Sequence, residues 1–590
     1  MALLSSAEPN PIEREPKKPT RGWYLKISFP LIAAILTLLV ARTVARIEDK
    51  YLQTHLLFFD PLSYQCHQCQ LWLEAQHKPR WELALEELSQ GTDVPDPFRT
   101  IPLILLNPRW LRNLHAHLIT SGLGLFTFLW LLLYTVRKRT GNFLYALGAG
   151  VLFCTIPGFY DPVLGLGAFW LDLTAGFFGS SAALCLLNSE RGSKMGWLAG
   201  FAILAGIASL ARFVSGPYLL LQCGPVLAFY LVAQWRQKRS FWWGVAAPTL
   251  LIGAILALLA GWYLFKQTPG MIYYYTTTGY GYQDALGSAQ FALFSTVSFL
   301  SVPLSIGLAV IAVAYISLGF RERWPGLLEA LWLALSVGVF LSITAIVGQA
   351  KHAIQYFVPI AAFALLCPVD LRRIQRNHTI VTGTLGALLL AVASIFCRQD
   401  LQENLWRPPR PQPWDIDRKV FYEAVTKRLL EDYPEKIVAA YFDEFDEYVY
   451  AIGVENFGRP PNLLPDRVFS VHESYLYSSF PGKTVPELVE MAWQQANAEC
   501  DIVLAFKDPG TAQVRSPYDY GDYLNPACSA IAFEMAKRLQ ADVRWRKLFV
   551  VPSKYLAGGV AVYANLNRFP EAQANRRSFE THCESGIASP

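Results

Sequence analysis

The sequence predicts a polytopic α-helical membrane protein with about eleven transmembrane helices and a soluble α/β domain at its C-terminal end. Hydrophobic residues make up 53% of the 590 positions and charged residues only 16%, whereas soluble domains carry about 25% charged residues. Apolar runs of bilayer-spanning length also follow one another from residue 28 to residue 397. A single soluble core of this length is not expected, because such cores stop growing near about 250–300 residues.

Residues 1–27 form a polar and basic arm, and residues 28–397 form the predicted transmembrane domain. The first apolar run lacks a small-residue cleavage pattern and follows a polar arm, which is typical of an uncleaved signal anchor. Each apolar run has the length that a helix needs to span a bilayer. The predicted spans are 28–45, 113–135, 142–159, 162–187, 196–213, 215–234, 241–265, 290–318, 325–347, 352–368 and 379–397.

Basic residues in the short connections predict how the chain is oriented in the membrane. Clusters of Lys and Arg alternate with connections that lack them, and lie at 137–139, 191–194, 236–239, 321–323 and 372–376. With a cytoplasmic N-terminus, every one of these clusters falls on the cytoplasmic side, as the positive-inside rule requires. Segments 46–112, 266–289 and 398–590 then lie outside the cytoplasm. The net charge of +5 is small, and without a basic run no nucleic-acid partner is expected.

The three outer segments differ in character. Segment 46–112 carries amphipathic stretches that predict interfacial helices, and segment 266–289 is rich in tyrosine, as an interfacial loop would be. Segment 398–590 alternates short β-type runs with helical patterns, so we expect a mixed α/β domain. Its predicted strands are 437–441, 502–506, 548–551 and 560–563, and its predicted helices are 420–430, 486–498 and 530–539.

The cysteines divide by compartment. Five lie in or beside apolar runs, where packing is the simplest role, and five lie in the outer segments, where disulfides are permitted. The Cys66–Cys69 pair has the spacing of a zinc half-site, a redox motif or a disulfide. No second pair at finger-like spacing and no thioredoxin-like pattern accompanies it, which favours a local disulfide or two thiols.

Acidic residues at the ends of the spans are the first candidates for chemistry, because ionisable groups at membrane depth are costly. Asp60 precedes a proline soon after the first span, so it suits either the start of an interfacial helix or a general base at the outer face. Asp161, also before a proline, suits a cap in a short outer turn or a second acid of the site. Asp172 follows within the next predicted span and needs a partner that the sequence does not identify.

Two basic positions are predicted to lie on the same outer face. Arg212, between two apolar runs, suits either snorkelling to the interface or binding of a phosphate group. Lys351 and His352 suit a basic helix end, although the positive-inside rule disfavours Lys in an outer loop. Acids and cations on one face of the membrane fit a phosphorylated lipid substrate better than they fit unrelated helix caps.

The layout over residues 28–397 resembles the GT-C membrane glycosyltransferases, in particular the protein O-mannosyltransferase and aminoarabinose-transferase branches. In that superfamily a large outer loop after the first helix carries an acid near its start, and Asp60 in Phe59-Asp60-Pro61-Leu62-Ser63-Tyr64 is similar to it. Pro61 stands where many members have a second acid, so Glu48 and Asp49 are further candidates.

The resemblance implies a function and a set of site residues. A sugar is expected to pass from a polyprenyl-phosphate donor to an acceptor, with Asp60 as base and Asp161 as a second acid near the donor or a metal. Arg212 resembles a family Lys before a Gly-Pro turn, and the resemblance implies that the donor phosphate contacts Arg212, Lys351, His352 and Tyr356. Two carboxylates without a histidine cluster would suit Mg²⁺ or Mn²⁺ if an ion binds.

Other functions remain open on the sequence. An O-antigen ligase or polysaccharide polymerase also uses prenyl-linked sugars, but usually has its large outer loop late in the chain. A lipid or solute transporter should show paired broken helices or inverted repeats near the midplane, and only one helix, near Pro303, is clearly interrupted by proline, with no obvious counterpart. An assembly protein that binds through its C-terminal domain would need fewer helices as an anchor.

Overall fold

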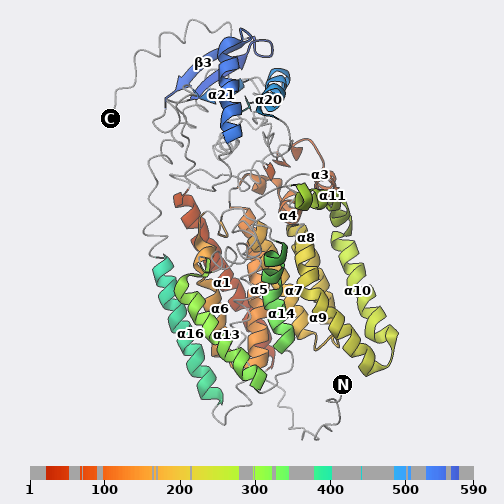
Figure 1. Cartoon of the computed structure of the whole chain (residues 1–590). Helices are drawn as coiled ribbons and strands as arrows, with labels where there is room; N and C mark the ends of the chain where they lie inside the picture. The colour runs from red at the N-terminus through yellow and green to blue at the C-terminus, as the bar shows by residue number, and fades with distance from the viewer. Residues whose placement is uncertain are drawn as a thin grey trace.

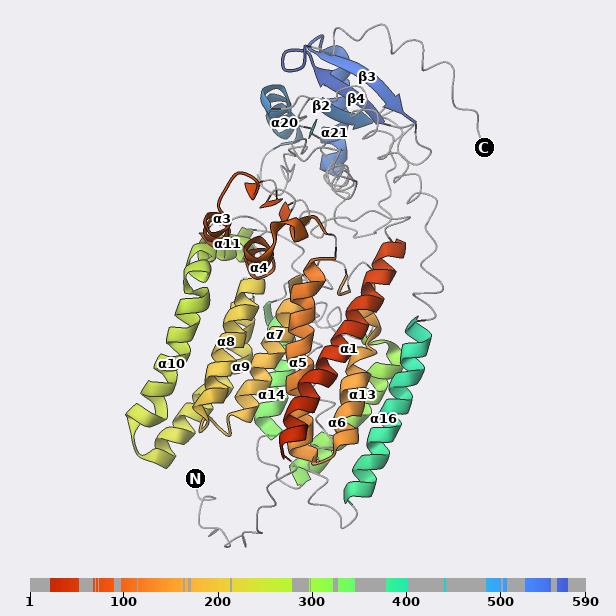
Figure 2. The same ribbon diagram turned by 180° about the vertical axis from the view of Figure 1, so that it is seen from behind.

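The computed structural model shows a bundle of long helices with a β-sheet beyond one of its ends (Figure 1). Helix α1 begins, at Gly22, at the opposite end of the bundle from the sheet, as the reverse view also shows (Figure 2). We call the two ends the sheet end and the basic end. The structure describes residues 22–51, 67–68, 71–72, 74–89, 97–113, 115–162, 165–167, 171–212, 215–277, 297, 299–321, 327–344, 378–401, 440–441, 484–499, 502–506, 526–552 and 560–570.

The helices of the bundle follow the apolar runs of the sequence. Within the described residues, five of them are long and apolar enough to cross a membrane, beginning at Ser28, His117, Leu171, Ser215 and Trp242. The helices are α1 (Gly22–Tyr51), α5 (His117–Thr140), α6 (Phe143–Cys154), α7 (Leu171–Asn188), α8 (Met195–Ala211), α9 (Ser215–Lys238), α10 (Ala247–Leu256), α11 (Trp262–Thr277), α13 (Val302–Arg321), α14 (Leu327–Thr344) and α16 (His378–Leu401). The expected span at 352–368 lies outside the described residues.

Among the helix boundaries that differ from the sequence prediction, three concern the end of the bundle that faces the sheet. Helix α1 continues to Tyr51, so Glu48 and Asp49 lie in its last turns and not in a loop. Helix α7 begins at Leu171 and not at residue 162, which places Asp172 in its first turn. The segment expected as a tyrosine-rich loop from residue 266 is helical as far as Thr277, because α11 continues through Pro269.

Aromatic side chains join the helices at the centre of the bundle. The ring centroids of Phe128 in α5 and Phe153 in α6 lie 4.7 Å apart. Phe159, in a short 3-10 turn (η2, Pro157–Tyr160), packs against Phe153 at 5.3 Å and against Phe177 of α7 at 5.5 Å. Such offset and edge-on pairs contribute about 0.5–1.5 kcal/mol beyond the burial of their area. They fix the turn that leads to Asp161.

Helices α6 and α16 cross where both carry glycine. A Cβ atom built on Gly386 would lie 2.6 Å from the backbone nitrogen of Tyr145, and one on Gly148 would lie 2.8 Å from the carbonyl oxygen of Gly386. Small residues of this kind let helix backbones approach closely where lipid supplies no hydrophobic drive between helices. Two hydrogen bonds similarly join α9 to α14, from Gln222 Nε2 to the oxygen of Leu333 and from Trp332 Nε1 to the oxygen of Leu221.

The basic end carries the predicted clusters of Lys and Arg. Helix α5 ends there with Arg137, Lys138 and Arg139, and α9 ends there with Arg236 and Lys238. Glu190 lies between Lys138 of α5 and Lys194, which precedes α8, at 3.3 Å from Lys138 Nζ and 2.5 Å from Lys194 Nζ. Both pairs are exposed, and such pairs contribute about 0–1 kcal/mol to stability. These basic residues therefore lie on the surface at one end of the bundle and add little to its stability.

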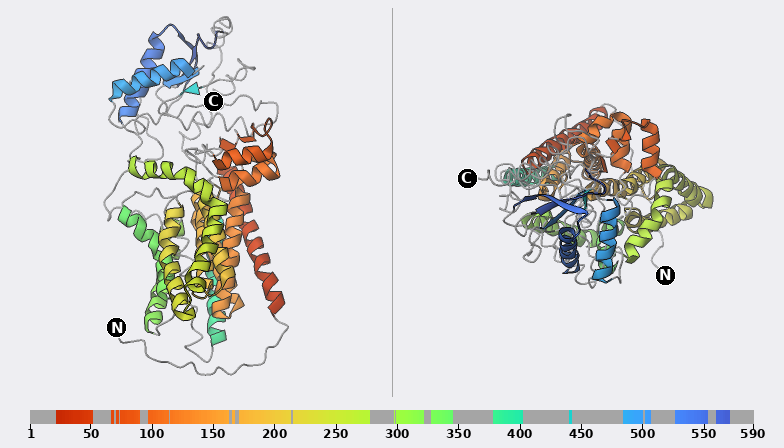
Figure 3. Two further views of the ribbon diagram at one scale, coloured as in Figure 1. Left: turned by 90° about the vertical axis from the view of Figure 1, so that its right-hand side faces the viewer. Right: turned by 90° about the horizontal axis from the view of Figure 1, so that it is seen from above.

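Two short helices from the segment after α1 lie at the sheet end. Helix α3 (Arg80–Ser89) packs against α4 (Pro97–Leu106) and lies beside α11, as the side view shows (Figure 3). Leu83, Leu103 and Ile104 form their shared core. Seen from above, the sheet overlies this end of the bundle (Figure 3).

The C-terminal part contains a mixed four-stranded sheet with two helices. The strands are β1 (Ala440–Tyr441), β2 (Ile502–Phe506), β3 (Trp545–Val551) and β4 (Val560–Asn565), in the order β1-β2-β4-β3, with only β1 and β2 parallel. Helices α20 (Val485–Glu499) and α21 (Pro526–Ala541) cover one face, to which Val503, Ala505, Ala561 and Tyr563 contribute alternate positions.

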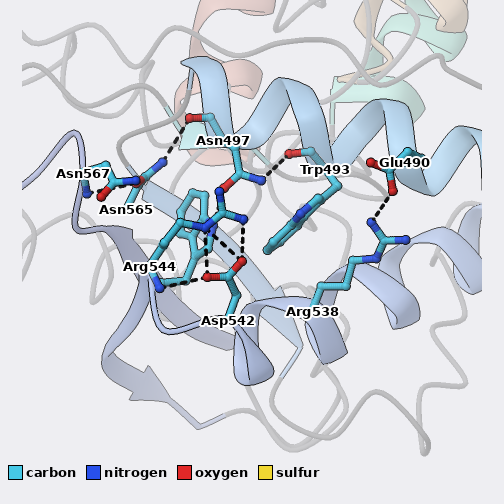
Figure 4. Close-up of polar contacts among 9 residues, drawn as sticks. Glu490, Trp493, Asn497, Arg538, Asp542, Arg544, Asn565 and Asn567 are labelled. Carbon is cyan, nitrogen blue, oxygen red and sulfur yellow. Dashed lines mark hydrogen bonds and ion pairs between the residues drawn. The ribbon is translucent and has the colours of Figure 1, made fainter.

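Polar contacts join the two helices of this part to the edge of the sheet (Figure 4). Arg538 of α21 donates to Glu490 of α20 at 2.8 Å, and Trp545 Nε1 donates to Asn497 Oδ1 at 3.0 Å. Glu490 and Asp542 each have a lowered pKa, mainly because of hydrogen bonds from Arg538 and Arg544 respectively. Every charge of this cluster is paired within it, so the cluster has a structural role.

Candidate active site

The candidate residues divide into two that the structure describes and four that it does not. Asp161 and Arg212 lie in the described part of the chain, and both stand at the sheet end of the bundle. The other four, Asp60, Lys351, His352 and Tyr356, lie outside the described residues. Their roles therefore stay predictions. The described part of the site consists of residues at the sheet end of the bundle.

Arg212 occupies the junction between α8 and α9. Its backbone is extended (φ −155°, ψ 119°), its N–H bonds the oxygen of Ala208, and its own oxygen accepts from Ser215 N at 2.9 Å. The predicted division into two spans, 196–213 and 215–234, is therefore present in the structure, as α8 and α9. The side chain is 9% exposed and does not extend freely to the interface.

The partner that Asp172 requires is Arg212. The Nε atom of Arg212 lies 3.0 Å from Asp172 Oδ1, and the Asp172 side chain is fully buried. Asp172 is in the first turn of α7 and Arg212 follows the last turn of α8. Each charge is therefore opposite in sign to the partial charge of its helix end, which is favourable. A buried charge pair of this kind is costly to form and more costly to break, because removing one member leaves the other uncompensated.

Asp161 stands at the start of a tight turn before α7. Gly165 N donates to the oxygen of Asp161 at 2.8 Å, and Leu166 N donates to the oxygen of Phe159 at 3.0 Å. A Cβ on Gly165 would lie 2.3 Å from the Asp161 oxygen, so only glycine fits there. Asp161 itself is half-buried at the bundle surface. The turn thus presents this carboxylate at the same end as Arg212.

A cluster of Glu48, Asp49 and His115, which the sequence did not predict, lies beside this turn. His115 precedes α5 and contacts both acids at the end of α1: its Nδ1 lies 2.9 Å from Glu48 Oε2, and its Nε2 lies 2.8 Å from Asp49 Oδ1. The hydrogen bond with Glu48 is the main cause that raises the pKa of His115 to about 9. The imidazole is therefore a cation at neutral pH.

Gly167 connects this cluster to the turn of Asp161. A Cβ built on Gly167 would lie 2.9 Å from Val44 Cγ1 and 3.2 Å from Glu48 Oε2, so the turn packs directly against the end of α1. The only sequence signal for the cluster was the adjacent pair of acids at the end of the first apolar run. Nothing in the sequence near His115 indicated that it would meet them.

A metal centre finds no support among the described residues. Within them, no group of three or more His, Cys, Asp or Glu side chains is arranged to hold an ion. His67, from the Cys66–Cys69 motif, is instead paired with the buried Glu87 at 2.9 Å, and Glu87 also accepts from Thr100. Cys66 and Cys69 lie outside the described residues, as does Asp60, on which the expectation of Mg²⁺ or Mn²⁺ depended.

Comparison with solved structures identifies the fold. The chain superposes on ArnT from Cupriavidus metallidurans in the apo state with a TM-score of 0.53 at 11% sequence identity, covering 92% of this chain and 98% of ArnT. The chain has the ArnT fold. A second ArnT structure, bound to undecaprenyl phosphate, superposes with a TM-score of 0.50 at 12% identity over 93% of this chain and 98% of ArnT. No family model matches the sequence, and no curated protein matches it significantly.

The likeness to ArnT confirms the predicted GT-C resemblance at the level of fold. It extends beyond residues 28–397, because the superposition covers nearly the whole of both chains. The likeness therefore includes C-terminal residues that the sequence resemblance did not reach. At 11–12% identity it shows the arrangement of the chain and not the identity of its site residues.

Proposed function

We propose that this protein transfers a sugar from a polyprenyl-phosphate donor to an acceptor at the outer face of the membrane. The observation that carries the proposal is the ArnT fold over nearly the whole chain, together with the binding of undecaprenyl phosphate in one of the two ArnT structures. Acids and cations gathered at one end of an otherwise apolar bundle support it. Hexosyl and pentosyl donors fit this reasoning equally.

The proposed chemistry is an inverting displacement at the anomeric carbon. Asp60 takes the proton of the acceptor nucleophile as it attacks, and the lipid phosphate leaves with the electron pair of the broken C–O bond. Cationic and hydrogen-bonding groups hold the departing phosphate, for which we propose Arg212, Lys351, His352 and Tyr356. Asp161 stabilises the positive charge that develops on the sugar ring.

Asp172 has a supporting role in this proposal. Its carboxylate lies 3.0 Å from Arg212 Nε and so supplies the opposite charge that keeps the buried guanidinium near it. The planar guanidinium can face a carboxylate along one edge and a phosphate along another, which a lysine ammonium cannot do. Arg212 would thus act as a cation held in place before the donor arrives.

The rest of the chain is assigned by location. We propose that residues 1–27 lie in the cytoplasm and that residues 398–590 form an extracytoplasmic domain above the site. We propose that the prenyl chain of the donor lies between apolar helices of the bundle, five of which, within the described residues, are long enough to cross a membrane. The acceptor, whether protein, lipid or glycan, would approach from the side of the C-terminal sheet.

Purified protein and polyprenyl-phosphate sugars test the proposal directly. Wild type is expected to release polyprenyl phosphate, and Asp60→Asn is expected to slow release by about 10²–10⁴-fold, as loss of a general base does. Glu190→Gln, at the basic end, is the matched control and should leave the rate unchanged.

Each alternative function gives a different result in the same assay. Release unaffected by Asp60→Asn would remove Asp60 from the mechanism. Growth of a polysaccharide chain in place of single sugar transfer would identify a polymerase or ligase. Absence of turnover with any carrier, together with substrate counterflow in vesicles, would identify a transporter.

A further inference from the structure

His115 bridges two carboxylates through both nitrogens of its ring. Nδ1 faces Glu48 Oε2 at 2.9 Å and Nε2 faces Asp49 Oδ1 at 2.8 Å. A neutral imidazole carries only one N–H, so one of these contacts would then join two acceptors. When both carboxylates are ionised, both contacts are hydrogen bonds only if the ring is protonated, and the raised pKa of His115, about 9, agrees with that geometry.

The burial of the Glu48 carboxylate in this bridge is energetically unfavourable. The Glu48 residue is 2% exposed, and within the described structure its Oε1 atom has no hydrogen-bond partner. A buried polar atom without a partner costs about 1–3 kcal/mol, and more if it is charged. An apolar side chain at position 48 would avoid that cost. Stability alone therefore does not account for the carboxylate, which indicates a role in the site.

The bridge lies where three parts of the candidate site meet. Glu48 and Asp49 precede the segment 52–114 that carries Asp60, and His115 follows it, so the bridge joins the two ends of that segment. Gly167, in the turn that begins at Asp161, packs against Glu48 and Val44. One ion pair thus joins the end of α1 to the residue before α5 and contacts the turn that begins at Asp161.

We propose that the Glu48–His115 pair is a positioning device that holds the turn of Asp161 in place for sugar transfer. This inference rests on the proposed function in that Asp161 is taken as a working acid. Glu48 and His115 are positioning residues and touch neither donor nor acceptor. Loss of the pair displaces Asp161 and leaves the affinity for the donor unchanged.

Kinetics distinguish positioning from binding. Glu48→Gln keeps the shape of the side chain and removes its charge, and His115→Gln removes the cation. Each is expected to lower kcat by about 10–100-fold, the cost of small misplacement, with KM for the donor within about threefold of wild type. Glu190→Gln, which breaks an ion pair at the basic end, is the control and should change neither constant.

Asp49→Asn provides an internal comparison, because Asp49 is 61% exposed and Glu48 only 3%. Its effect on kcat should be smaller than that of Glu48→Gln. Wild-type kcat in both Glu48→Gln and His115→Gln would overturn the proposal. So would a rise in KM that accounts for the whole loss, because that result assigns the pair to donor binding.

A second measurement does not depend on activity. With Val44→Cys and Gly167→Cys, oxidation should form a disulfide between positions 44 and 167, which mass spectrometry of the linked peptide detects. Adding Glu48→Gln should slow its formation by about tenfold, the effect of a small displacement on a reaction between held groups, while adding Glu190→Gln should not. Equal rates in all backgrounds would overturn the positioning role. If wild type shows no turnover, the proposed function fails while this measurement still decides whether the pair holds the turn.

Discussion

At the scale of single residues, the pair Asp172–Arg212 makes a direct stability prediction. Arg212→Ala leaves the fully buried Asp172 carboxylate without its 3.0 Å partner, and breaking a buried pair in this way costs about 3–5 kcal/mol. The double variant Asp172→Asn with Arg212→Met removes both charges and should recover most of that loss. Denaturant unfolding in detergent measures the difference.

The exposed pair Lys138–Glu190 provides the control for this measurement. Its members are 33% and 48% exposed, so Lys138→Met should cost less than about 1 kcal/mol. If Arg212→Ala is no more destabilising than Lys138→Met, then Arg212 is not the compensating charge of Asp172.

For each ion pair in the site, the sequence could predict one residue but not its partner. An acid within an apolar run implies a partner, and Asp172 was predicted to need one on that ground. Arg212 lies 40 positions further along, and only the packing of α7 against α8 brings the two together. His115 is a similar case, because its meeting with Glu48 depends on where α1 ends and α5 begins. Contacts between helix ends are set by packing and not by local sequence pattern.

At the scale of helices, the crossing of α6 and α16 predicts a position that tolerates no side chain. Gly386→Ala would place a Cβ 2.6 Å from Tyr145 N, and the helices must separate to admit it. Overpacking of this kind costs about 1–3 kcal/mol. Gly383→Ala, one turn earlier in α16, meets only Asn142 Nδ2 at 3.8 Å and should be neutral or slightly stabilising.

Thermal unfolding of the two variants in the same detergent tests this prediction, because they make the same chemical change on the same helix. A lower melting temperature for Gly386→Ala than for Gly383→Ala is expected. Equal melting temperatures would mean that α6 and α16 do not cross at Gly386.

Hydropathy located the helices well but missed some of their ends, and the reason is physical. A membrane helix must be continuously apolar over about 20 residues, so its presence is recorded in composition alone. A turn within an apolar stretch cannot be located from composition. Residues 165–167, inside the predicted span, lie in a turn in which Gly165 N and Leu166 N donate to the oxygens of Asp161 and Phe159. Helix α11 shows the converse, because its tyrosines suggested a loop where the backbone is helical.

At the scale of the whole molecule, charge is separated between the two ends of the bundle. The basic clusters of α5 and α9 lie at one end, and the contacts of Asp172, Glu48 and His115 lie at the other. Hydropathy and charge in the sequence predicted this polarity because both act on the chain as it enters a bilayer. The superposition on ArnT could not be predicted residue by residue, since at 11% identity the fold is carried by patterns and not by particular side chains.

The orientation of this polarity in the membrane gives the last prediction. Lys and Arg near the ends of spans remain on the cytoplasmic side, so the basic end should face the cytoplasm and the sheet end should face outward. In a bacterial host, alkaline phosphatase fused after Asn113 or at the C-terminus should be active, since the enzyme folds only outside the cytoplasm. The same enzyme fused after Lys138 or Lys194 should be inactive, and a green fluorescent protein at those two positions should fluoresce. Fluorescence at the C-terminus would invert the orientation, and with it the face of the membrane on which sugar transfer is proposed.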